Sequence, residues 1–122
     1  MPSRFGFPSA HRLHSSKEFG RVFAEPVRSV DRFFTVLARP NGLNVPRLGL
    51  TVSRRAAKRA VDRNRLKRLA RESFRLQQRL PSCDFVVVAK PGAGDAPGPE
   101  LRRSLDRHFD RLRRKAGPAA NG

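Results

Sequence analysis

The chain is poor in several residue types, and each shortage excludes a class of protein. It has a single cysteine, Cys83, and neither tryptophan nor tyrosine. One cysteine cannot form an internal disulfide, which excludes a disulfide-stabilised secreted domain and is typical of a reducing cytosol. No apolar run approaches the roughly 18 residues of a membrane-spanning helix, and the N-terminus has no apolar core of the kind that a signal peptide needs. We therefore expect a cytoplasmic protein that has no membrane partner.

Acidic residues are also scarce: 10 Asp and Glu stand against 27 Lys and Arg, a formal charge of +17 on 122 residues. So much like charge on a small body repels itself, and this is tolerable when the working partner is anionic. Hydrophobic residues make up 38% of the chain and recur periodically, which distinguishes it from a basic disordered tail. The length is that of one ordinary domain.

The sequence also lacks the residue patterns that are typical of catalytic and metal sites. The histidines at 11, 14 and 108 have no metal-ligand spacing with Cys83 or with one another. The chain contains neither a Gly-rich phosphate loop nor a nucleophile elbow. We therefore expect no catalytic residue, no metal site and no firmly bound cofactor on this chain, and we interpret Cys83 as a packed residue.

The hydrophobic pattern predicts helices at three places. The first begins after Ser15, carries Phe19, Val22 and Phe23 at i, i+3, i+4, and ends at Pro26. The second occupies roughly 61–79. The third follows a Gly/Pro-rich loop at 91–99 and presents one apolar face, made of Leu101, Leu105, Phe109 and Leu112.

Four strands are predicted, at 27–30, 32–38, 47–53 and 84–89. The short connection between the second and the third favours an antiparallel pair. The fourth is continuously apolar and should be central, with both faces covered. The order α-β-β-β-α-β-α predicts a single-domain α+β sandwich over 15–115, with helices on a four-stranded sheet. Residues 1–14 should be a loosely ordered arm and residues 116–122 a disordered tail.

Nearly half of the excess charge lies between residues 54 and 75, where ten basic residues meet two acidic ones, a net +8. At about 100° per residue, the arc opposite Leu66 carries Asn64, Lys67, Arg68, Arg71 and Arg75, with Arg63 and Arg65 at its edges. A solvated helix face usually mixes signs, because like charges at i, i+4 destabilise a helix. The pattern therefore favours phosphate binding, for which the planar guanidinium fork is suited.

The phenylalanines leave two interpretations open. Phe19 and Phe23 on a short helix are more often core residues, but aromatic rings beside a basic groove can also stack single-stranded bases. Phe33 and Phe34 should point to opposite faces of their strand, so that one belongs to the core and the other is free to touch a ligand.

Two stretches carry a resemblance to a known family: 47–55, which reads RLGLTVSRR, and 63–75, which reads RNRLKRLARESFR. They resemble the bacterial ribonuclease P protein component and its Arg-Asn-Arg signature helix. The resemblance covers about residues 10–112 and includes the Phe19–Phe23 helix and the strand at 84–90, in the same order. Many members have Gly-Asn-Ala-Val before the signature, whereas this chain has Lys58-Arg59-Ala60-Val61.

The resemblance implies that this chain is the accessory subunit of an endoribonuclease that removes the 5′ leader of precursor tRNA. The RNA subunit is catalytic and requires Mg²⁺, and the protein is a monomer that binds that RNA 1:1. The residues implied to bind the RNA subunit are Arg63, Asn64, Arg65, Lys67, Arg68 and Arg71. Those implied to line or border the leader cleft are Phe19, Phe23, Phe34, Arg54 and Arg55. The family also implies a left-handed β-α-β crossover, against the general rule.

Two alternatives remain at this point. A ribosomal or other structural RNA-binding protein explains the charge and the fold equally well, but not the aromatic cleft residues or the ordered set of motifs. A DNA-binding protein is the weaker alternative, because no helix-turn-helix spacing is present.

Overall fold

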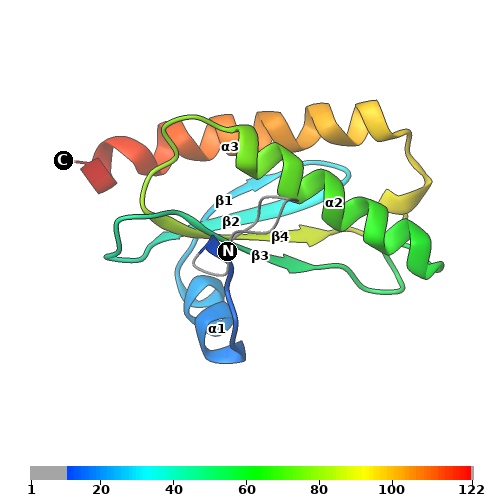
Figure 1. The fold of residues 1–122 in the computed structure, drawn as a ribbon, viewed down its shortest axis with the longest axis horizontal. Coiled ribbons are helices and arrows are strands. Elements are labelled where there is room, and N and C mark those ends of the chain that lie inside the picture. Colours follow the sequence, from blue (N-terminus) through cyan, green and yellow to red (C-terminus); the bar gives the residue numbers. More distant parts are fainter. Residues whose placement is uncertain (1–10, 122) are drawn as a thin grey trace, which may run out of the picture.

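The computed structural model describes residues 11–121 and the side chains of residues 11–116. Its elements follow the predicted order, with one additional short 3₁₀ helix (Figure 1). They are α1 (Ser16–Ala24), β1 (Val27–Val30), β2 (Phe34–Pro40), β3 (Arg47–Thr51), α2 (Ala60–Leu76), β4 (Cys83–Ala89), η2 (Ala93–Asp95) and α3 (Gly98–Asn121). The α+β class and the four-stranded sheet are thereby confirmed.

The strand order in the sheet is β1-β2-β4-β3. The prediction that β4 is central is confirmed, but the predicted antiparallel pairing of β2 with β3 is wrong. β3 pairs in parallel with β4, with Leu48 opposite Phe85, and β2 pairs antiparallel with β4, with Val36 opposite Val87. The most apolar strand takes the interior place, and the loop 41–46 is long enough to cross the two strand spacings, about 10 Å, that this requires.

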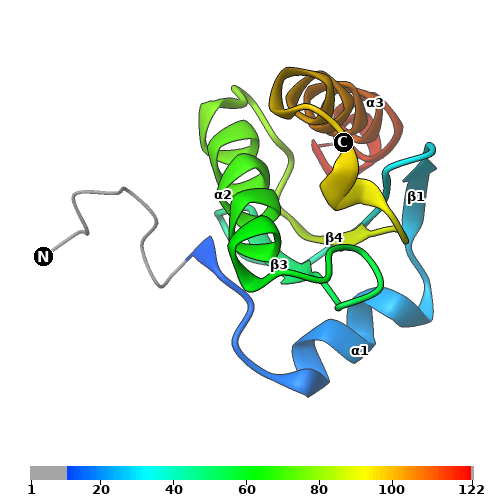
Figure 2. The same ribbon diagram turned by 90° about the vertical axis from the view of Figure 1, so that its right-hand side faces the viewer.

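The helices cover both faces of the sheet unequally. α2 and α3 pack side by side on one face, and α1 lies alone on the other (Figure 2). Since α2 connects the parallel strands β3 and β4, these three elements form a β-α-β unit, and its crossover is left-handed (Figures 1 and 2).

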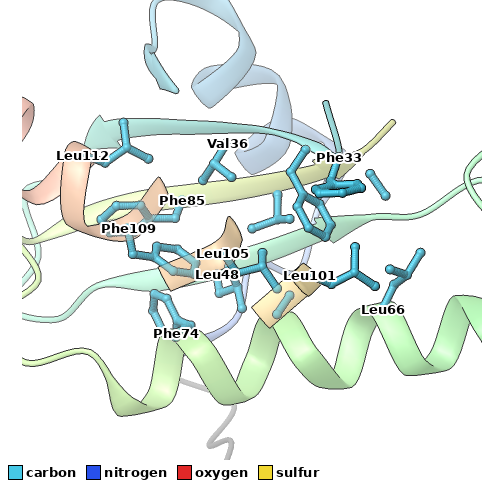
Figure 3. Packing of buried hydrophobic residues seen from close by; sticks show 14 of the residues in the cluster. Phe33, Val36, Leu48, Leu66, Phe74, Phe85, Leu101, Leu105, Phe109 and Leu112 are labelled. Atoms are coloured by element: carbon cyan, nitrogen blue, oxygen red, sulfur yellow. The ribbon is translucent and has the colours of Figure 1, made fainter. Parts of the chain in front are cut away.

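The main core lies between the sheet and the pair α2 and α3. Its centre is formed by Phe74, Phe85 and Phe109, whose rings pack edge to face with centroids 5.8 to 6.0 Å apart (Figure 3). A smaller core lies under α1, where Val22 is fully buried against Leu37 and Val86. β4 therefore supplies alternate residues to two cores, which explains its continuous apolar sequence.

Both ends of the described chain are more ordered than the sequence indicated. The amide of Leu13 donates to the carbonyl of Leu48 at 3.0 Å, so the segment before α1 is tied to the edge strand β3. The first ten residues of the predicted arm lie outside the described residues. The sequence predicted a disordered tail from residue 116; in the structure α3 continues to Asn121, and Ala116 is buried in the main core. Gly122 lies outside the described residues.

Candidate RNA interface

The solvent-facing side of α2 is a row of cations without acidic partners. Asn64, Arg68, Arg71 and Arg75 are exposed, and Lys67 is half-buried. The helix has two acidic residues, and both are engaged elsewhere: Asp62 lies 3.7 Å from Arg59, and Glu72 lies 3.6 Å from Arg102 of α3. Within the side chains that the structure describes, no carboxylate neutralises the row. We call Asn64, Lys67, Arg68, Arg71 and Arg75 the α2 basic face.

The two arginines of the Arg-Asn-Arg signature have a different environment. Arg63 donates through Nη1 to the carbonyls of Ala57 and Lys58 at 3.1 and 2.7 Å. Arg65 donates through Nη2 to the carbonyls of Gly94 and Ala96 at 2.8 and 3.2 Å. Each arginine therefore holds a loop beside the N-terminal half of α2, where the sequence predicted only contacts with RNA.

The loops that these arginines hold also pack closely on each other. The amide of Gly94 donates to the carbonyl of Ala56 at 2.9 Å, and a Cβ on Gly94 would come within 2.5 Å of the Cβ of Ala57. Only glycine permits this approach. The loop from 54 to 59 is thus a fixed rim of the basic face.

A groove of about 230 Å³ lies where α1, β3 and α2 meet. Phe19 of α1 lies directly on Gly49 of β3, since a Cβ on Gly49 would be 2.5 Å from the Cζ atom of Phe19. Lys67 and Arg71 of the α2 basic face line the same groove. Arg12, Leu13, Leu48 and Leu50 complete it. The structure therefore brings Phe19 together with two of the predicted phosphate-binding residues.

Arg12 and Gly49 belong to this groove as well, although neither was predicted from the sequence. Arg12 belongs to the segment predicted to be loose. Gly49 interrupts an apolar strand, and such a glycine often marks the close approach of another group. That signal was available in the sequence, but it does not say which group approaches.

The other residues predicted for the leader cleft are more dispersed. Phe23 is 48% exposed on α1, whereas Phe34 is 1% exposed in the main core, so the prediction that Phe34 lines the cleft is wrong. Arg55 lines a separate pocket that includes Lys58 and Arg59. Arg54 is exposed and lines neither pocket.

Phe33 and Phe34 both belong to the main core, so the prediction of opposite faces is wrong. The reason is a turn at Asp31, whose Oδ1 accepts hydrogen bonds from the amides of both phenylalanines at 2.9 Å. β2 begins only at Phe34, so strand alternation does not apply to the pair.

A network of ion pairs fixes α1 on its face of the sheet. Ser15 and Glu18 form a capping box, and Glu18 also binds Arg47 at 2.9 Å. Arg47 in turn makes two hydrogen bonds of 2.8 Å to Asp84, which is 2% exposed. The hydrogen bond from the His14 amide, helped by those from Ser15 and Arg47, lowers the pKa of Glu18, and the pKa of Arg47 is raised chiefly by its hydrogen bonds to Asp84.

Two further titratable groups of the described interior are Cys83 and His108. Burial raises the pKa of the Cys83 thiol to about 11. His108 is 1% exposed, and its Nδ1 is 2.7 Å from the hydroxyl of Ser29. Its Nε2 lies 3.1 Å from Asp31 without a well-directed hydrogen bond, and burial lowers its pKa. Among the described residues, no three His, Cys, Asp or Glu side chains cluster as metal ligands would.

The site therefore consists of an exposed cationic helix face, a groove that holds an aromatic ring, and a rim of braced loops. Guanidinium groups suit phosphate oxygens, and aromatic rings suit unpaired bases. These features define an α+β protein that binds RNA. None of the helices in the described part of the chain is long and apolar enough to cross a membrane.

Comparison with known proteins agrees with this class. The family model described as Ribonuclease P matches residues 7–113. The chain is 48% identical over 118 residues to the ribonuclease P protein component of Methylococcus capsulatus, covering 96% of this chain and 92% of that protein. It is 45% identical over 117 residues to that of an Escherichia coli strain, covering 94% and 98%.

Solved structures give the same result. The RNase P protein of Staphylococcus aureus superposes with a TM-score of 0.78 at 27% identity, over 85% of this chain and 96% of that one. The RNase P protein of Thermotoga maritima gives 0.68 at 31% identity, over 79% and 98%. The chain belongs to the ribonuclease P protein family, which confirms the identification based on the Arg-Asn-Arg helix.

Proposed function

We propose that the chain is the accessory protein subunit of ribonuclease P in the cytoplasm. It binds the catalytic RNA subunit through the α2 basic face and holds the 5′ leader of precursor tRNA in the groove beside α1. The observation that carries this proposal is the position of Lys67 and Arg71. They belong to the α2 basic face and also line the groove that contains Phe19. One set of cations can therefore serve two RNA strands that must lie side by side during cleavage.

The protein contributes by electrostatics and positioning. The RNA subunit and its substrate are both polyanions and repel each other, and a protein of net charge +17 between them reduces that repulsion. Mg²⁺ supplies the catalytic chemistry when it is bound by the RNA subunit. Because the protein supplies fixed cations, less Mg²⁺ should be needed for the two RNAs to associate.

The groove suits a single strand better than a duplex. Phe19 is half-buried and packs on Gly49 and against the smaller core that contains Leu13, so its free side can stack on one unpaired base. Phe23 is exposed on the same helix and offers a second ring. Lys67 and Arg71 lie where they can contact the backbone of the same strand. We propose a monomeric protein that binds the RNA subunit 1:1.

The test is cleavage of a precursor tRNA at low Mg²⁺ by the matching RNA subunit, with and without the protein. We expect the protein alone to be inert and to restore cleavage by the RNA. A protein that binds the RNA tightly and adds nothing to cleavage would instead be a structural RNA-binding protein.

A pair of variants localises the effect. R68Q/R71Q removes two charges from the α2 basic face, and R113Q/R114Q removes two charges from arginines of α3 that are paired with Asp110. Rescue should fall with the first pair and persist with the second. Equal losses would mean that net charge alone acts.

A further inference from the structure

The outer side of α3 carries a second row of unneutralised arginines. Arg103, Arg107 and Arg111 are exposed at i, i+4 and i+8, so they follow one another along one side of the helix. Within the described side chains, none of them forms an ion pair. The one polar contact of the row is a long one of 3.4 Å, from Arg111 to the hydroxyl of Ser29.

The remaining arginines of α3 contrast with this row. Arg102 lies 3.6 Å from Glu72 and 3.2 Å from Asp106, at the contact between α2 and α3. Arg113 and Arg114 both bind Asp110. Glu72, Asp106 and Asp110 are therefore used on or near the α2–α3 contact, whereas Glu100 lies beside the outer row without forming an ion pair with it among the described side chains. Like charges at i, i+4 destabilise a helix, a cost that a bound polyanion offsets.

A pocket extends this row toward the sheet. Arg103 and Arg107 line a depression of about 490 Å³ together with Arg32, whose guanidinium lies 5.0 Å from the centre of the Phe33 ring. Asp31 and Glu100 also line it. Hydrogen bonds from Ser104 and from two main-chain amides hold the carboxylate of Asp31 inward. We call Arg32, Arg103, Arg107 and Arg111 the α3 basic surface; with Asp31 and Glu100 counted, its formal charge is +2.

This surface is separate from the α2 basic face. β3 and β1 are the two edges of the sheet, and the groove of Phe19 lies at β3. α2 lies above the β3 side and α3 above the β1 side (Figure 2). The acidic residues at the α2–α3 contact lie between the two rows. One strand bound at the groove would therefore not occupy the α3 basic surface.

We propose that the α3 basic surface binds the phosphate backbone of a second RNA segment, so that the protein bridges two parts of its ribonucleoprotein. This inference rests on the proposed function. Four guanidinium groups suit phosphate oxygens. The exposed large apolar residues of the described chain are Phe23, Val30, Leu43, Val61 and Leu76, and none of them belongs to α3. The surface thus lacks the apolar anchors that a protein partner or a membrane would engage.

The second segment can come from the RNA subunit or from the precursor tRNA, and the salt dependence of binding distinguishes the two. The test variant is R103Q/R107Q/R111Q. The matched control is R102Q/R113Q/R114Q, which loses the same charge from the same helix but from arginines that are already paired. For each protein, the dissociation constant is measured against salt, first for the RNA subunit alone and then for precursor tRNA binding to the assembled holoenzyme.

Each neutralised phosphate contributes about 0.7 to 0.9 to the slope of log K against log salt. We expect the test variant to lower that slope by about 2 to 3 for one of the two RNAs, and the control to lower it by less than 1. A loss with the RNA subunit assigns the surface to that RNA, and a loss only with the holoenzyme assigns it to the precursor. Unchanged slopes for both RNAs, or equal losses in test and control, would overturn the inference.

The variant R68Q/R71Q separates this inference from the proposed function. If it lowers RNA-subunit binding while R103Q/R107Q/R111Q changes the binding of neither RNA, the α3 surface is an ordinary solvated face and the proposed function stands. If R68Q/R71Q also has no effect, the proposed function itself fails.

Discussion

Replacing either of two neighbouring arginines of α2 should have opposite consequences for stability and for RNA binding. Arg65 is half-buried and donates to the carbonyls of Gly94 and Ala96, whereas Arg68 is exposed and makes no hydrogen bond within the described chain. We predict that Arg65→Gln destabilises the fold and that Arg68→Gln weakens RNA binding without changing the fold.

The magnitudes follow from these contacts. A buried hydrogen bond to a charged group contributes about 1.5–3 kcal/mol, but one nitrogen serves both carbonyls and the Arg65 side chain is partly solvated, so about 1–2 kcal/mol is expected in total. In a domain of this size that corresponds to a Tm lower by roughly 4–10 °C. Arg68→Gln should change stability by less than about 0.5 kcal/mol, and should reduce the salt slope of RNA-subunit binding by about 1.

Thermal unfolding followed by circular dichroism and binding titrations across salt concentrations measure both quantities on the same samples. The reasoning fails if Arg65→Gln keeps the wild-type Tm while its salt slope falls, because Arg65 would then be a phosphate contact and not a brace. It also fails if Arg68→Gln lowers the Tm by more than a few degrees.

Three further predictions concern the groove and the interior. Phe34→Ala should cost about 3–5 kcal/mol of stability in urea unfolding, whereas Phe23→Ala should cost less than about 1 and should reduce the affinity gained from a longer leader. Gly49→Ala should displace the Phe19 ring, costing about 1–3 kcal/mol and removing the dependence of precursor affinity on leader length. The lowered pKa of His108 means that the unfolded chain takes up a proton first as the pH falls below about 6.5. Stability should therefore decline from that pH downward, and His108→Gln should flatten the decline between pH 6.5 and 5.

The element order could be predicted because each element has a local signal. Ser15 and Glu18 form the capping box that their spacing indicates, and Pro26 follows the end of α1. The apolar run of β4 predicted a central strand, and the sheet confirms it. Each of these signals is local. The spacing of apolar residues along the sequence shows directly which positions of a helix or strand are buried.

The partner of β3 could not be predicted in the same way. Leu48 and Leu50 indicate a strand, but their pattern is the same whether the neighbour is β2 or β4. The choice between these partners depends on which arrangement buries both faces of β4, the most apolar strand. That is a property of the whole sheet. The same limit applies to Phe33 and Phe34, whose shared burial follows from a turn held by Asp31.

The arginines of α2 show most clearly what the helical spacing of residues can and cannot predict. The rotation of about 100° per residue around α2 correctly placed Arg63 and Arg65 at the edges of the exposed arc and Arg68 within it. It did not show that the edge positions face loops whose free carbonyls accept hydrogen bonds. A guanidinium has five donors, so an edge arginine can brace a loop with some and still direct others outward. Bracing and RNA contact are therefore compatible in one residue, and for this reason the signature arginines have to be tested by stability and by salt dependence together.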